Sequence, residues 1–306
     1  MKNFTLAYKL LLILTVAMWG AAFPLMKNIS NAVDSIPFIA LRMTIASITL
    51  LIINIKLLKG VTKKMLLSGA IYGALLTFSS FFQVQGLRFT TTTNSGFIGT
   101  TYVIFMPFFV YALFKKKPTL QTVLGIIIVV TGLFLICGIL TLTPFSFSGS
   151  SLNIGDLLTL IFSILTCVYL LWGDFMARKY NVSIITFVHV FFAAIFSWII
   201  LPFSQQRHMD LSNNTILLSV IYCGVFSSAL GYLFTLIAQS KLDPTTTSIF
   251  WSIEPVFVVL FAAVIPDMYG KYEYPTISSL IGGTLILSGV FVTSVIKREK
   301  NSNKTV

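Results

Sequence analysis

Two stretches of the chain, PTLQTVLGIIIVVTG at residues 118–132 and PTISSLIGGTLILSG at residues 275–289, carry one pattern. Each begins Pro-Thr and continues through an apolar run with two glycines seven residues apart, and matched positions lie 157 apart, as 118 and 275 do. The glycines are Gly125 and Gly132 in the first stretch and Gly282 and Gly289 in the second. A spacing of seven places both glycines on one helix face, where small residues let another helix approach closely, within one chain or between protomers. The pattern predicts two copies of one helix.

A threonine run followed by a proline also occurs twice, in the same order. Thr90–Thr93 precedes Pro107, and Thr245–Thr247 precedes Pro255. A proline inside an apolar helix removes one backbone donor and loosens the helix locally. Both prolines are therefore candidates for hinge or packing positions.

A third match concerns ionisable side chains. Arg42 falls where His189 falls when the apolar segments that begin near residues 35 and 182 are aligned. Several matches in one order favour a duplicated chain. We expect a first unit at residues 1–146 and a second at residues 147–306.

The composition places the chain in a membrane. Of 306 residues, 56% are hydrophobic and only 10% are charged, which leaves too few polar groups to cover a soluble protein of this size. A membrane-spanning helix needs about 20 apolar residues. Ten such segments are predicted, at about residues 8–26, 35–56, 66–86, 94–114, 119–142, 155–178, 182–203, 214–237, 243–265 and 275–296. The first of these has no cleavage site of the signal-peptide type at its end.

The distribution of basic residues predicts the orientation. With ten spans both termini lie on one side, and most of the 21 Lys and Arg fall in loops on that side. The other loops carry only Lys27, Arg88, Arg207 and Lys271. Because cytoplasmic loops are enriched in Lys and Arg, both termini are predicted to lie in the cytoplasm, in a bacterial inner membrane.

Five spans per unit is an odd number, so the second unit enters the membrane from the opposite side to the first. Such an inverted repeat is typical of secondary transporters, in which two similar halves alternate around one central site. The predicted fold is an all-α integral membrane protein of ten transmembrane helices in two inverted five-helix repeats.

Other classes of protein lack their usual signals. The basic residues lie in short runs between apolar segments, so no nucleic-acid partner is predicted. The three cysteines, Cys137, Cys167 and Cys223, show no CxxC spacing, and no metal or cofactor site is predicted. The sequence contains no HExxH motif and no acidic pair within a span, so an enzyme is not predicted. It also contains no GxxxxGK[ST] loop, so ATP binding is not predicted. A channel would favour repeated filter segments or charged rings around an oligomeric axis, and the predicted inverted repeat argues against that class.

Several segments together resemble the EamA-type branch of the drug/metabolite transporter superfamily. These are FIALRMTIAS around Arg42, GLRFTTTTNSGFIGTTYVIFMPFF from Gly86, SIEPVFVVLF from Ser252 and the paired Pro-Thr segments. The resemblance covers nearly the whole chain and implies ten helices in two inverted halves, with export or exchange of amino acids, related metabolites or amphipathic compounds. The chain departs from the family pattern after the fourth and ninth spans, where it has Leu-Phe-Lys at 113–115 and Pro-Asp-Met at 266–268.

Glu254 is a carboxylate near the middle of the ninth span, beside Pro255 and Trp251. An ionisable group at that depth costs roughly 3 kcal/mol or more unless it faces a cavity or a partner. We expect Glu254 either to contact a substrate amine or a coupling proton, or to serve as a structural carboxylate paired, for example, with Arg42.

Arg42 lies about seven residues inside its span, where it attracts a substrate carboxylate or phosphate, snorkels outward, or pairs with Asp34. His189 is either a titratable group or a helix contact. Gln83 and Asn94 are the stronger of the remaining pathway candidates. The others are Trp19, Tyr102, Tyr232 and Trp251, each of which has interhelical packing as its alternative role.

The predicted function is secondary transport, by alternating access, of amino acids or related small metabolites. Glu254 would then bind the amine, and Arg42 or a helix N-terminus at a threonine run the carboxylate. The alternative is efflux of drugs or other cationic amphiphiles, because Glu254 stands beside aromatic residues that suit a cation. The expected partners are a small-molecule substrate, the lipid bilayer and, if Glu254 titrates, protons.

Overall fold

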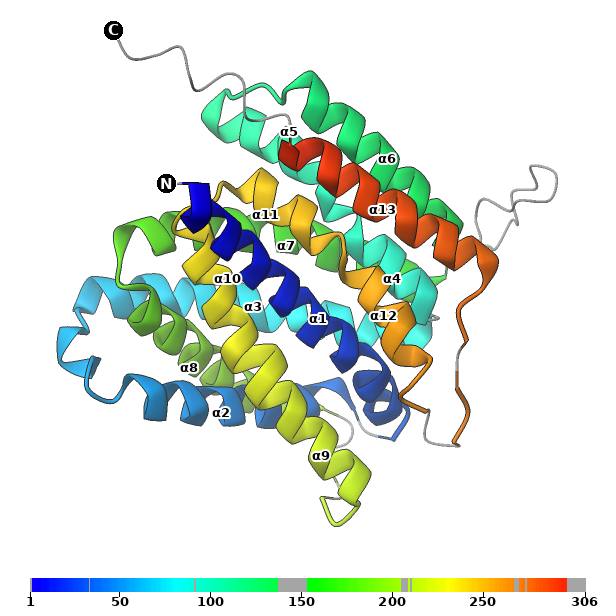
Figure 1. Ribbon diagram of the computed structural model, residues 1–306. Helices are drawn as coiled ribbons and strands as arrows, with labels where there is room; N and C mark the ends of the chain where they lie inside the picture. Colours follow the sequence, from blue (N-terminus) through cyan, green and yellow to red (C-terminus); the bar gives the residue numbers. More distant parts are fainter. Residues whose placement is uncertain are drawn as a thin grey trace, which may run out of the picture.

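The computed structural model describes residues 2–32, 34–90, 92–136, 153–204, 209, 211–266, 270–272 and 274–295. These residues form helices and the loops that connect them, and they contain no strand (Figure 1). The α-helices are α1 Lys2–Ala32, α2 Ser35–Asn54, α3 Lys63–Phe89, α4 Thr92–Thr100, α5 Tyr102–Phe114, α6 Leu120–Ile136, α7 Ile154–Lys179, α8 Val182–Ile200, α9 Asn214–Tyr222, α10 Gly231–Gln239, α11 Pro244–Trp251, α12 Glu254–Ala262 and α13 Ile277–Val295. Three short elements complete the fold: 3-10 helices η1 Leu58–Gly60 and η2 Leu201–Phe203, and a π-helix, η3 Cys223–Leu230.

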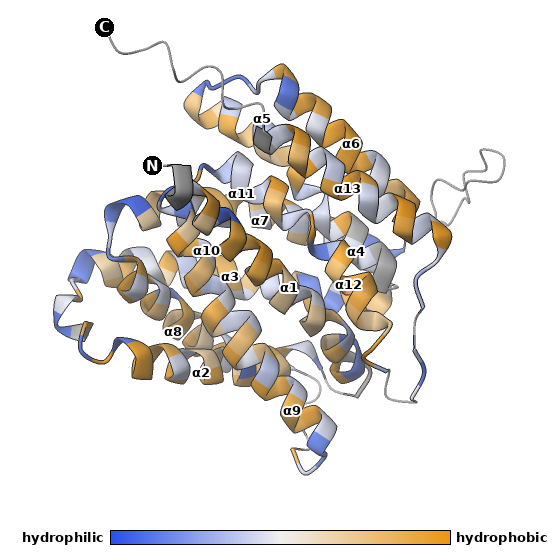
Figure 2. Cartoon of the chain, viewed as in Figure 1, coloured by the Kyte–Doolittle hydropathy of each residue, from blue (hydrophilic) through white to orange (hydrophobic). Residues whose placement is uncertain are grey.

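Among the described residues, seven helical stretches are long and apolar enough to cross a membrane, and three shorter apolar helical stretches accompany them. Large apolar side chains on these helices point outward, as Ile52, Leu67, Phe108, Leu218 and Phe291 do, each at least 66% exposed. Figure 2 shows hydrophobic residues along the outer faces of the bundle. An apolar exterior of this extent suits contact with lipid, so the predicted all-helical membrane protein is confirmed.

Two expected spans are interrupted near their middle. The fourth divides at Thr101 into α4 and α5, and the ninth divides at Ser252 and Ile253 into α11 and α12. Pro255 lies in the first turn of α12, where a missing backbone donor costs nothing. Pro107, by contrast, lies inside α5, six residues beyond the interruption. The break in the fourth span therefore coincides with Thr101, whose hydroxyl donates to the carbonyl of Ile98 at 2.6 Å.

The expected eighth span is also not one regular α-helix. Between α9 and α10 the chain forms the π-helical turns of η3. Such wide turns are rare and occur frequently at functional sites, because they displace backbone carbonyls from their usual partners. In this protein η3 faces α1 and α2.

The four matched glycines pack α6 directly against α13. A Cβ atom built on Gly132 would lie 2.5 Å from the carbonyl oxygen of Gly282, and one built on Gly125 would lie 2.9 Å from that of Gly289. The two helices are antiparallel and lie side by side at one edge of the bundle (Figure 1). The glycines therefore make an intrachain contact between backbones, which leaves no room for a side chain.

The remaining helices form two packed groups. In the α3 group, α3, α4 and α5 pack on α7; in the α1 group, α10, α11 and α12 pack on α1. Helices α2 and α8 pack against each other and against members of both groups. We call the end of the bundle where α1 begins and α13 ends the terminal face, and the other end the opposite face.

Replacing Asp156 with alanine is expected to lower the stability of the detergent-solubilised protein by about 1–2 kcal/mol. Asp156 is buried, completes a capping box with Asn153 at the start of α7, and accepts the Thr90 hydroxyl at 2.7 Å. The measurement is thermal unfolding. The control is Asp174→Ala, which removes only a half-exposed ion pair with Arg178 and should cost about 0.3–0.5 kcal/mol. Equal losses in the two variants would contradict the structural role of Asp156.

Candidate substrate cavity

A cavity lies between the α1 and α3 groups, and a few polar side chains line it among aromatic and apolar ones, as in small-molecule sites. Seven residues singled out from the sequence line it: Trp19, Arg42, Gln83, Tyr102, Tyr232, Trp251 and Glu254. The others are Phe23, Met26, Leu76, Ser79, Ser80, Phe162, Thr166, Tyr169 and Ser227. Asn94 lies in α4, but its side chain is outside the described part of the structure.

Arg42 is a buried cation in this wall, with 3% of its surface exposed. Its guanidinium donates to the Tyr232 hydroxyl at 3.0 Å and contacts the sulfur of Met26 at 3.3 Å, whereas its Nε has no partner. The alternative in which Arg42 pairs with Asp34 is wrong, because Asp34 pairs with Arg88 at 2.6 Å. Within the described residues Arg42 has no anionic partner.

Glu254 begins α12, directly after the interruption of the ninth span. Its carboxylate is partly buried, and no described residue forms a hydrogen bond or ion pair with it, Arg42 included. Two neighbouring donors, the Tyr102 hydroxyl and the Trp251 indole N–H, are also buried without a partner. Buried polar groups are nearly always satisfied in folded proteins. Three buried polar groups without a partner, on Arg42, Tyr102 and Trp251, thus line the same cavity as the Glu254 carboxylate.

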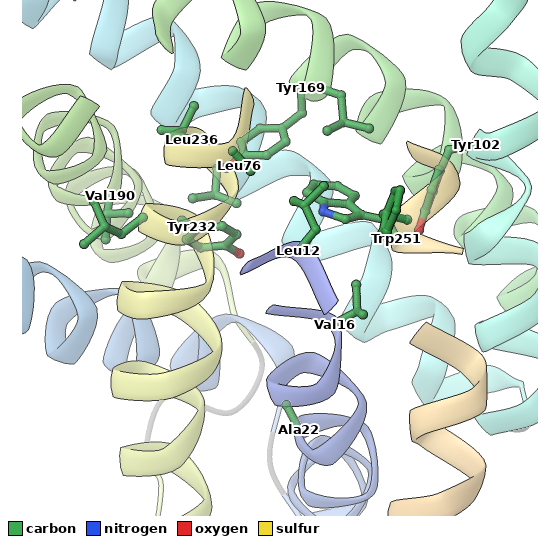
Figure 3. Close-up of a cluster of buried hydrophobic side chains, with 14 of the residues drawn as sticks. Leu12, Val16, Ala22, Leu76, Tyr102, Tyr169, Val190, Tyr232, Leu236 and Trp251 are labelled. Atoms are coloured by element: carbon green, nitrogen blue, oxygen red, sulfur yellow. The ribbon is translucent and has the colours of Figure 1, made fainter. Parts of the chain in front are cut away.

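Aromatic rings form most of one side of the cavity. The rings of Trp19 and Trp251 meet edge to face with centroids 4.6 Å apart, and Tyr102 meets Trp251 at 6.0 Å. The indole N–H of Trp19 donates to the carbonyl of Ser227 at 2.8 Å, so the π-helical turns of η3 hold this wall in place. Figure 3 shows Tyr102, Trp251, Tyr169 and Tyr232 converging on the centre of the bundle.

Half of the floor of the cavity, Tyr169, is not among the residues predicted from the sequence, whereas Tyr232 is. Tyr169 and Tyr232 lie with ring centroids 6.2 Å apart, and behind them Tyr72 stacks on Tyr169 at 4.5 Å. His189 does not line the cavity. It is fully buried behind this floor, 4.4 Å from the ring of Tyr72, with its Nδ1 3.1 Å from the carbonyl oxygen of Ile185 and its Nε2 3.4 Å from the Tyr169 hydroxyl.

The cavity occupies the half of the bundle nearer the opposite face. Gln83 lies six residues before the end of α3 and Phe162 eight residues after the start of α7, and both ends are at that face. Leu12, Val16 and Phe250, which precede Trp19 and Trp251 in their helices and so lie nearer the terminal face, are buried and do not line the cavity.

A helical membrane protein whose interrupted helices surround a central, partly polar cavity has the architecture of a membrane transporter. The EamA-like transporter family matches the sequence twice, at residues 6–138 and at residues 153–295. The chain belongs to this family of transporters.

The chain is similar along most of its length to several curated proteins. It is 26% identical to an uncharacterized transporter of Archaeoglobus fulgidus, over 93% of this chain and 84% of the relative, and 25% identical to the uncharacterized transporter YyaM of Bacillus subtilis, over 93% of each. A protein crystal structure with 16% sequence identity superposes with a TM-score of 0.75, over 96% of this chain and 99% of the other. At that identity the likeness is one of fold.

Proposed function

We propose that this transporter moves amino acids or related small metabolites that carry both an amine and a carboxylate. The observation that carries the proposal is the pair of unneutralised charges in one cavity: Arg42 without an anion and Glu254 without a cation among the described residues. A buried charge is stable only when it is paired or hydrogen-bonded. A zwitterionic substrate supplies both missing partners at once, its carboxylate to Arg42 and its ammonium group to Glu254.

The proposed mechanism is secondary transport by alternating access between two inverted five-helix repeats. The α6 and α13 contact supports this symmetry, because Gly125 meets Gly289 while Gly132 meets Gly282. Such reciprocal contact is the signature of a twofold axis. The interruptions at Thr101 and at Ser252 occur in equivalent spans of the two halves, and interrupted helices near the middle of the membrane are where transporters bind substrates and ions. Basic loops support cytoplasmic termini in a bacterial inner membrane, so the terminal face is the cytoplasmic one.

A second candidate is efflux of lipophilic cations. It is favoured by the edge-to-face contact of Trp19 with Trp251 next to Glu254, since aromatic faces and one carboxylate suffice to hold a cation. This candidate leaves Arg42 without a function, because a second cation in the cavity repels a cationic substrate.

The test uses purified protein in liposomes and three matched competitors. The liposomes are loaded with a metabolite extract, and the exported compounds are identified by mass spectrometry. The amino acid that is exported fastest is then compared, as a competitor, with the matching amine that lacks its carboxylate and the matching acid that lacks its amino group. The zwitterion is expected to compete at least about tenfold better than either, since each lost charge leaves one buried protein charge unpaired. Equal competition by the amine, or transport of simple cations alone, would overturn the amino-acid assignment.

Glu254→Gln is expected to remove the preference for the zwitterion over the acid, because the amide keeps the shape of the side chain but loses its charge. It should also remove stimulation of transport by a pH gradient if Glu254 carries the coupling proton. The measurement is counterflow of the labelled amino acid with and without an imposed gradient. Gln121→Glu on α6, away from the cavity lining, is the matched control for a change between amide and carboxylate. Unchanged pH-driven transport in Glu254→Gln would exclude proton coupling through this residue.

A further inference from the structure

Two glutamines occupy matched positions in the two halves of the chain. Gln85 and Gln239 are 154 apart, as are the threonines at 91 and 245 that follow them. Two further pairs match in sequence: Trp19-Gly20 in α1 and Trp172-Gly173 in α7 are 153 apart, and the same offset makes Ala17 of α1 the counterpart of Leu170 of α7.

The two glutamines have different surroundings in the described conformation. Gln239 is fully buried and donates from Nε2 to the carbonyl of Leu170 at 3.0 Å, a bond from the α1 group to the α3 group. It packs on Gly173, where a Cβ atom would lie 2.8 Å from its Oε1. Among the described residues Gln85 makes no such bond across the groups, whereas the Oε1 atoms of both glutamines are buried without a partner.

The asymmetry extends to the matched Trp-Gly pairs. Trp19 donates to Ser227 at 2.8 Å, whereas the indole N–H of Trp172 is buried without a partner. Gly20 is occupied by Phe257 of α12, since a Cβ atom there would lie 2.5 Å from the Phe257 Cβ. At Gly173, the matched glycine of α7, the neighbours of such a Cβ atom are Gln239 and Tyr72 instead.

We infer that Gln239 and Gln85 are alternate locks between the two helix groups. Gln239 holds the terminal side closed in the described conformation, and in the other conformation Gln85 holds the opposite side closed by donating to the Ala17 carbonyl beside Gly20. The inference rests on alternating access as proposed above. A carbonyl oxygen has a second lone pair, so Ala17 accepts this bond without breaking its helix. At the opposite rim the groups are joined by Lys27, whose ammonium group donates to the carbonyls of Leu87 and Thr90 at 3.0 and 3.2 Å.

The test measures accessibility, which requires no knowledge of the substrate. A thiol is introduced on the cavity wall as Ser80→Cys, after the cysteines at 137, 167 and 223 have been replaced by alanine. Labelling with a membrane-impermeant maleimide is compared in right-side-out and inside-out vesicles. Gln239→Leu is expected to raise labelling from the terminal side about fivefold, the factor for one net hydrogen bond, and Gln85→Leu to lower it by a similar factor. The double variant should return to the starting ratio.

Two further variants guard against misfolding as an explanation. Gly173→Ala displaces Gln239 without altering it, and it should shift labelling in the same direction as Gln239→Leu. Gln121→Leu on α6 should leave the ratio unchanged. If the starting protein is labelled from both sides but the two glutamine variants do not shift the ratio in opposite directions, the lock is wrong and alternating access stands. If no variant and no starting protein is ever labelled from the terminal side, alternating access itself fails, and the inference fails with it.

Discussion

Arg42→Gln is expected to reduce transport of the amino acid at least about thirtyfold, the lower end of the range for removing one partner of a buried, hydrogen-bonded ion pair. The guanidinium is 3% exposed and has an unsatisfied Nε facing the cavity region, so a substrate carboxylate is its natural anion. Arg42→Lys should also fail, because a compact ammonium group cannot bind a carboxylate with two parallel bonds while holding the Tyr232 hydroxyl. The measurement is the rate of counterflow in liposomes at matched protein content.

Arg88→Gln is the control for this prediction. Arg88 belongs to an ion pair with Asp34 at the opposite face, and its side chain is 41% exposed. Its loss should change transport less than about fivefold, since partly exposed pairs contribute up to roughly 1 kcal/mol. Wild-type rates in a well-folded Arg42→Gln protein would remove the carboxylate from the proposed substrate.

Gly282→Ala is expected to lower the stability of the protein strongly, because it adds a methyl group at the contact between α6 and α13. The new Cβ would lie 2.5 Å from the Gly132 carbonyl oxygen and 3.0 Å from the Ile136 nitrogen, and backbone atoms cannot move aside as a flexible side chain can. Overpacking of this kind costs about 1–3 kcal/mol. The expected result is a fall of several degrees in the melting temperature of the detergent-solubilised protein.

Gly283→Ala, one residue further along α13, provides the matched control. A Cβ atom there meets only the Val256 side chain, at 3.6 Å, which is ordinary contact. Because alanine favours helix over glycine, this variant should be as stable as the natural protein or slightly more so. Equal melting temperatures for the two variants would mean that α6 and α13 do not pack through their glycines.

The membrane class and the family could be predicted because they rest on properties of whole segments: apolar length, loop charge and the repeated Pro-Thr and glycine pattern. The cavity-lining positions of Arg42, Gln83 and Glu254 could be anticipated for a simpler reason. A polar side chain in the middle of an apolar span must face the protein interior.

The rest depended on three-dimensional arrangement. Tyr169 and Tyr72 are two aromatic residues among many in apolar helices, and nothing in their local sequence separates a cavity floor from ordinary packing. The interruption at Thr101 has no local signal, because a threonine hydroxyl bonded to its own helix is common, whereas Pro107, the candidate for a hinge or packing position, lies inside α5. The π-helical turns of η3 likewise have no sequence signal that distinguishes them from a regular helix.

The pairing of α6 with α13 has a consequence for how the protein is made. The ribosome completes α6 before it synthesises the 140 residues at 137–276 that separate it from α13. During this time the glycine face of α6 has not yet met α13. A chain that stops short of α13 leaves this face open. The α13 of a neighbouring chain presents the same glycine face, so we expect exchange of α13 between neighbouring chains to be an assembly error of this fold.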